Sequence, residues 1–212
     1  MKNLALSLPV LLLVVFGFFT FWNRLNPQWL PVVLSEDGPT YRIEGKYPQI
    51  GISAIDDQIK KSVDNASAEI KSLPANPSDS ATPKNLLTFA FDRPYVGQDI
   101  VSVRLIISQD TGGAHPLTLL SGLNFDRGTA RKLELKDALE YIGKTVREVS
   151  EKSTAQFQSA FRDGFFPEGA DSNPENYSSF LFTENSVGFM FQQYQVAAYA
   201  NGPQEVIFKR VK

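Results

Sequence analysis

Residues 87–125 read LTFAFDRPYVGQDIVSVRLIISQDTGGAHPLTLLSGLNF, and this stretch decides the fold class. Apolar side chains alternate with other residues over 87–91 and again over 101–107, a period of two that is typical of half-buried strands. Asp110–Gly113 has the composition of a tight turn, after which the chain returns through residues 117–125. The stretch therefore predicts consecutive antiparallel strands.

Helical patterns lie on both sides of these strands. Apolar residues three and four positions apart run along residues 52–73, which is one face of a helix, and Ser53 with Asp56 resembles a capping box at its start. A second helical pattern covers about residues 136–163, and Gly143 is expected to split it. The sequence therefore predicts two principal helices.

The last third of the chain returns to strand patterns. Residues 180–183 and 187–191 flank a short polar turn and predict a hairpin, and residues 205–210 predict a final strand. The helical patterns interrupt groups of strands without β-α-β alternation. We therefore predict an α+β fold, with a mainly antiparallel sheet packed against the two principal helices.

The N-terminal residues form a separate unit. Residues 4–22 carry no charge and would span roughly 28 Å as a helix, close to the thickness of a bilayer core. No small-residue cleavage site follows them, so the pattern favours a retained transmembrane signal-anchor over a cleaved signal peptide. We expect a signal-anchor over residues 1–22, a proline-containing tether over 23–40 and a folded domain over 41–212. The domain is expected outside a cytoplasmic membrane that the chain crosses once.

Composition limits the chemistry. Twenty-one basic residues are balanced by 23 acidic residues, and without a basic cluster nucleic acid is not an expected partner. The chain has no cysteine and a single histidine, which excludes disulfides, thiolate nucleophiles and multi-histidine zinc sites. No cofactor and no metal site are predicted.

Four segments carry a resemblance to a known family: YPQI (Tyr47–Ile50), GGAHP (Gly112–Pro116), LELKD (Leu133–Asp137) and FQQYQVAAYANG (Phe191–Gly202). Their order and spacing resemble the extracytoplasmic domain of the lysozyme-sensing anti-sigma-V factors, which also accompanies some peptidoglycan deacetylases as a noncatalytic N-terminal module. The similarity spans about residues 41–212. It implies an α+β cell-envelope domain that binds a partner, in some members lysozyme itself.

Seven residues are candidate ligand contacts, and none is a catalytic candidate: Asp110, Gly112, Gly113, His115, Gln193, Tyr194 and Tyr199. The imidazole of His115 titrates near neutrality and suits a ligand contact; the alternative is that Pro116 only holds its backbone extended at the start of a strand. Tyrosine rings beside an amide suit an amphipathic platform for a sugar or a protein. Simple packing of Tyr194 is the alternative.

These observations predict a membrane-anchored, noncatalytic envelope domain that binds a cell-wall glycan or a wall-active protein such as lysozyme. One alternative is an envelope hydrolase that uses carboxylates near the Asp110–His115 turn. Another is a structural subunit of an envelope complex. A triad of Ser121, His115 and Asp126 is disfavoured, because the sequence around Ser121 lacks the signature of a nucleophile elbow.

Overall fold

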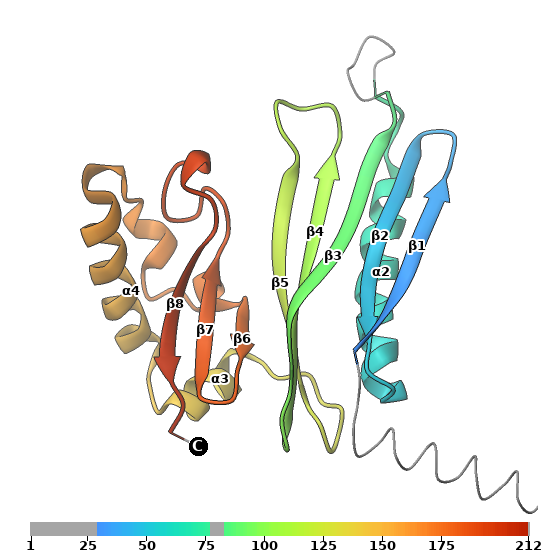
Figure 1. The fold of residues 1–212 in the computed structure, drawn as a ribbon. Helices are drawn as coiled ribbons and strands as arrows, with labels where there is room; N and C mark the ends of the chain where they lie inside the picture. The colour runs from blue at the N-terminus through green and yellow to red at the C-terminus, as the bar shows by residue number, and fades with distance from the viewer. Residues whose placement is uncertain (1–28, 77–82, 212) are drawn as a thin grey trace, which may run out of the picture.

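A computed structural model describes residues 29–76 and 83–211, which form two β-sheets and three α-helices (Figure 1). The first sheet has the order β1 (Leu30–Asp37), β2 (Tyr41–Gln49), β3 (Asn85–Val96), β4 (Ile100–Asp110) and β5 (Leu117–Asp126). The second has the order β6 (Phe180–Phe182), β7 (Ser186–Phe191) and β8 (Gln204–Lys209). The helices are α2 (Ser53–Ser72), α3 (Leu135–Ile142) and α4 (Val146–Phe161). Short 3-10 turns occupy Arg162–Gly164, Pro167–Ala170, Pro174–Tyr177 and Tyr199–Asn201.

The α+β class and the mainly antiparallel pairing are confirmed, but the prediction of a single sheet is wrong. The expectation that β-α-β alternation is absent is also wrong, because β2 and β3 pair in parallel with α2 between them in the sequence. Within the described residues no helix is long and apolar enough to cross a membrane. The predicted anchor, residues 4–22, lies outside the described residues.

Part of the predicted tether is a strand. Leu30–Asp37 forms β1, which pairs antiparallel with β2 and places Val32 and Leu34 against the core of the first sheet. Prolines and a glycine near this segment indicated irregular structure. Pro31 is tolerated because β1 is an edge strand, where a missing N–H need not break the ladder. The described fold therefore includes Leu30–Asp37, ahead of the start expected at Tyr41.

The predicted helices are confirmed with corrected caps. Asp56 does not form a box with Ser53; its carboxylate accepts hydrogen bonds from the backbone N–H groups of Ile50 and Gly51 at 2.8 and 3.0 Å. The second helical pattern divides at Gly143, as predicted, into α3 and α4. The α4 N-terminus has a complete capping box between Thr145 and Glu148.

Each sheet has its own core. Helix α2 packs on one face of the first sheet and buries Ile43, Ile55, Leu87, Val103 and Phe125. Helices α3 and α4 pack on the face of the second sheet that is turned away from the first, as Figure 1 shows for α4, and this core is rich in aromatic rings: Phe157, Tyr177, Phe189, Phe191 and Phe208. Each core covers the outer face of its own sheet, so the two sheets meet along their inner faces.

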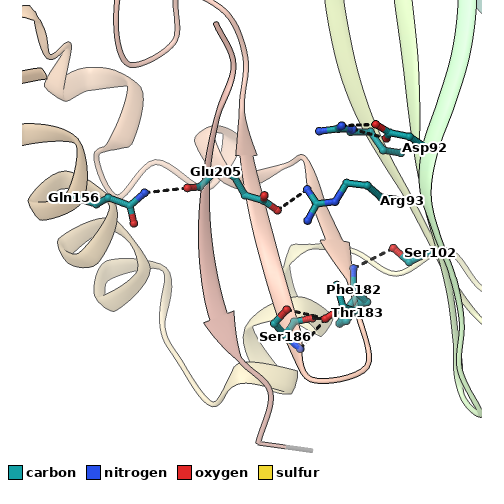
Figure 2. Close-up of polar contacts among 9 residues, drawn as sticks. Asp92, Arg93, Ser102, Gln156, Phe182, Thr183, Ser186 and Glu205 are labelled. Atoms are coloured by element: carbon teal, nitrogen blue, oxygen red, sulfur yellow. Dashed lines mark hydrogen bonds and ion pairs between the residues drawn. The ribbon is translucent and has the colours of Figure 1, made fainter. Parts of the chain in front are cut away.

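The sheets join along β5 and β6. Gly122 allows the approach, because a Cβ there would lie 1.8 Å from the carbonyl oxygen of Phe180. Asn124 Nδ2 donates to the same carbonyl at 2.7 Å, and Ser102 Oγ donates to Asn124 Oδ1 at 2.6 Å. Ser102 Oγ also accepts from the Phe182 N–H at 3.0 Å (Figure 2). A small apolar contact of Leu120, Leu181 and Met190 completes this line.

Candidate functional site

The turn between β4 and β5 presents the single histidine. Asp110 Oδ1 accepts a hydrogen bond from the Gly112 N–H at 3.0 Å, and Gly112 has a φ of +80°, which glycine adopts without steric cost. The turn therefore needs Asp110 and Gly112 for its own shape. His115 is exposed at the end of the turn, and its Nδ1 lies 3.1 Å from the carbonyl oxygen of Pro116.

The segment after β7 presents the two tyrosines. Gln195 fixes this segment, since its Oε1 accepts from the Gln192 N–H at 2.8 Å and its Nε2 donates to two carbonyls, of Gly169 and Asn176, at 3.0 Å each. Tyr194 has a φ of +65°, a left-handed conformation that is uncommon for a residue with a side chain. Tyr194 is 55% exposed.

His115, Tyr194 and Tyr199 come together in what we call the ring cluster. The His115 ring stacks on Tyr199 with 3.9 Å between centroids and 23° between planes. Tyr194 lies 5.9 Å from His115 and 5.3 Å from Tyr199, and its hydroxyl is 3.3 Å from His115 Nε2. The three rings form a partly exposed aromatic surface with hydrogen-bonding groups on its rim.

The other candidates have different positions. Asp110, Gly112 and Gly113 belong to the turn that carries His115, and Asp110 has further contacts besides its bond to Gly112. Gln193 is half-buried, and its Oε1 is shielded from solvent with no hydrogen-bond partner. A buried carbonyl oxygen without a partner is unfavourable, so Gln193 would gain from a donor that reached it.

The triad of Ser121, His115 and Asp126 is not assembled. The polar contacts of the His115 ring are with Pro116 and Tyr194. Asp126 instead accepts from the backbone N–H and the hydroxyl of Thr129, both at 2.8 Å, and these two bonds lower the pKa of its carboxyl. Within residues 29–76 and 83–211, no group of three or more His, Asp or Glu side chains is arranged to hold a metal ion.

Sequence reasoning missed a groove beside the edge of β5. It has a volume of about 580 Å³ and a largely apolar lining that includes Leu119, Leu133 and Pro174. At its β5 wall the amide of Gln192 bonds both the N–H and the carbonyl of Leu120, each at 2.8 Å. The alternation in β5 gave no signal for this groove, because the opposing wall comes from segments far away in the sequence.

Comparison with known proteins shows what the chain is similar to. The family model DUF3298, described as a protein of unknown function, matches residues 127–210, which cover α3, α4 and the second sheet. These residues are similar to the DUF3298 family. Two solved DUF3298 structures share the fold over both sheets. The one from Bacteroides fragilis has a TM-score of 0.59 at 17% identity and covers 87% of this chain and 90% of that one. The one from Pseudomonas aeruginosa has a TM-score of 0.54 at 17% identity, covering 86% and 90%.

A curated relative gives a functional context. The chain is 24% identical over 185 residues to the peptidoglycan-N-acetylmuramic acid deacetylase PdaC of Bacillus subtilis (strain 168). The alignment covers 84% of this chain and 39% of PdaC, so the chain spans about two fifths of that relative's length. The resemblance to a family that accompanies peptidoglycan deacetylases is confirmed.

Proposed function

We propose that this DUF3298-like protein is a noncatalytic binding module of the cell envelope and that the ring cluster binds cell-wall glycan. The observation that carries the proposal is the exposed stack of His115 on Tyr199 with Tyr194 beside it. Flat rings with polar edges contact the apolar faces of sugars while their hydroxyl and imidazole groups bond sugar hydroxyls. PdaC, by its name, acts on peptidoglycan, which favours a wall glycan as the ligand.

Sedimentation with purified peptidoglycan sacculi tests this proposal. We expect the wild-type protein to sediment with sacculi, and Tyr199→Ala and His115→Ala to remain mostly in the supernatant. Val33→Ala is the matched control, because Val33 is 68% exposed on β1, the opposite edge of the first sheet. Equal sedimentation of all four proteins would contradict the role of the ring cluster.

A wall-active protein is the other partner that the sequence suggested. The same four proteins are therefore passed over immobilised lysozyme. Retention by lysozyme that depends on Tyr199, without sedimentation by sacculi, would replace the glycan with a protein ligand. If the wild-type protein neither sediments with sacculi nor is retained by immobilised lysozyme, the proposed function is contradicted.

The alternatives predict other outcomes. A hydrolase that uses carboxylates near the Asp110–His115 turn would release soluble fragments from sacculi, and Asp110→Ala would abolish the release. We propose no such step, since Asp110 shapes the turn through Gly112. A structural subunit would instead give one constant protein partner when membranes are cross-linked.

We also propose that residues 4–22 anchor the protein in the cytoplasmic membrane, with the folded part outside the cytoplasm. The uncharged length of this segment supports the proposal. Cell fractionation should place the intact protein with membranes, and protease added to spheroplasts should digest the folded part. Intact protein in the soluble fraction would contradict the anchor.

A further inference from the structure

The ring cluster is assembled from both sheets. His115 follows β4 and precedes β5 in the first sheet, whereas Tyr194 and Tyr199 lie between β7 and β8 of the second. The geometry of the His115 stack on Tyr199 therefore depends on the relative orientation of the two sheets. Whatever sets that orientation also sets the geometry of the cluster.

The contacts along β5 and β6 do not set the orientation alone. Gly122, Asn124 and Leu120 on β5, together with Ser102 on β4, meet β6 and its neighbours. A contact farther from β5 and β6 would add to these and restrict the angle between the sheets further. The structure has such a contact.

Arg93 on β3 and Glu205 on β8 join the sheets farther from β5 and β6. Arg93 Nη1 lies 2.8 Å from Glu205 Oε1, and Figure 2 shows the two side chains meeting between the sheets. In the sheet order, β4 separates β3 from β5, and β7 separates β8 from β6. The side chains are only 33% and 26% exposed, so this pair is less screened than a surface pair.

The local backbone around Arg93 and around Glu205 allows this pair to form. Arg93 has a φ of +51° within an irregularity of the β3–β4 ladder, an uncommon conformation for a residue with a side chain. The Glu205 carboxylate lies over Gly188, where a Cβ would be 2.1 Å from Glu205 Oε1. Gln156 of α4 holds the Glu205 carbonyl at 2.9 Å (Figure 2).

A neighbouring ion pair, between Arg104 and Asp92, occupies the other arginine near Glu205. Arg104 faces Asp92 across the β3–β4 ladder and bonds both of its carboxylate oxygens, with Nε at 2.7 Å from Oδ1. This guanidinium is therefore occupied by Asp92, although Glu205 is close enough to interact with it electrostatically. Glu205 thus has Arg93 as its hydrogen-bonded partner across the sheets.

We propose that Arg93 and Glu205 are positioning residues that hold the two sheets at the angle at which His115 stacks on Tyr199, and that they thereby set the affinity of the ring cluster for wall glycan. The second half of this inference rests on the proposed function. The first half concerns the ligand-free protein, so an experiment can contradict either half without contradicting the other.

The ligand-free test uses the single histidine of the chain, whose imidazole protons give one resolvable set of proton NMR signals. The stack on Tyr199 shifts these signals upfield through the tyrosine ring current. Arg93→Glu and Glu205→Arg each place like charges together and should remove the upfield shift, whereas the double exchange should restore it. Lys60→Ala, which removes the Lys60–Asp64 pair on α2, is the control and should leave the signals unchanged.

The binding test uses soluble peptidoglycan fragments and calorimetry on the same variants, each checked for native circular dichroism. We expect each single variant to bind roughly 5-fold or more weakly, and the double exchange to recover most of the affinity. Unchanged His115 signals in the single variants would overturn the positioning role. Unchanged affinity in variants whose signals have moved would overturn the link to binding. If the wild-type protein binds no fragment while the His115 signals of the variants change as expected, the proposed function is overturned. Only the positioning role in the ligand-free protein then remains.

Discussion

Replacing Asn124 by alanine should destabilise the protein more than its small size suggests, because Asn124 joins the two sheets. It is 1% exposed, donates to the Phe180 carbonyl at 2.7 Å and accepts from Ser102 Oγ at 2.6 Å. Alanine would leave the Phe180 carbonyl and the Ser102 hydroxyl proton without these partners in a buried region. Each unsatisfied group costs about 1–3 kcal/mol, so we expect a loss of roughly 2–5 kcal/mol of unfolding free energy.

Urea unfolding followed by circular dichroism measures this loss. The midpoint should fall while the slope against urea stays constant, which separates a change in stability from a change in the denatured state. Asn65→Ala is the matched control, because Asn65 is exposed on α2, and its effect should stay within about 0.5 kcal/mol. A loss below about 1 kcal/mol for Asn124→Ala would refute the view that this buried polar chain joins the sheets.

Three further changes test other contacts. Gly122→Ala should destabilise by about 1–3 kcal/mol or prevent folding, because its Cβ would collide with the Phe180 carbonyl; an equilibrium unfolding curve checks this. The Lys144 ammonium, followed by the backbone and hydroxyl of the α4 cap, lowers the pKa of Glu148 from 4.5 to about 2. Its stabilising contribution should be complete above pH 4.5 and disappear as the pH falls through about 2, so Glu148→Gln should flatten that part of a stability–pH profile. Gln192→Ala should raise amide hydrogen exchange at the β5 edge, where the wild-type side chain protects an N–H.

Local periodicity predicted much of the fold. Of the apolar positions expected to face the core along α2, four are buried: Ile55, Ile59, Val63 and Ile70. The alternation over residues 87–125 gave β3, β4 and β5 in the correct order and pairing. These predictions hold because a helix face and a strand face are set by neighbours within a few residues.

The rest depends on contacts between distant residues. Strand β1 lies among prolines and a glycine, and it is stabilised by pairing with β2 and by packing of Val32 and Leu34 on the core, which its own sequence does not indicate. The packing of the two sheets on each other involves contacts such as that between Arg93 and Glu205, which are 112 positions apart. No local pattern specifies which charge of one strand meets which charge of another.

The candidate site was predictable in its chemistry but not in its assembly. Exposed aromatic residues and a lone histidine are recognisable from residue type, and the structure brings His115 together with Tyr194 across 79 positions. Gln193 was expected beside them, yet its carbonyl oxygen is shielded from solvent. The left-handed backbone of Tyr194 redirects the chain at this point, and residue type alone does not predict a positive φ at tyrosine.

The most direct test of the central claim follows the His115 imidazole signals while soluble peptidoglycan fragments are added to the wild-type protein. If the ring cluster is the glycan-binding surface, the signals move in a saturable manner, with the same dissociation constant that calorimetry gives. Saturable binding by calorimetry with motionless His115 signals would place the glycan elsewhere on the molecule and contradict this account.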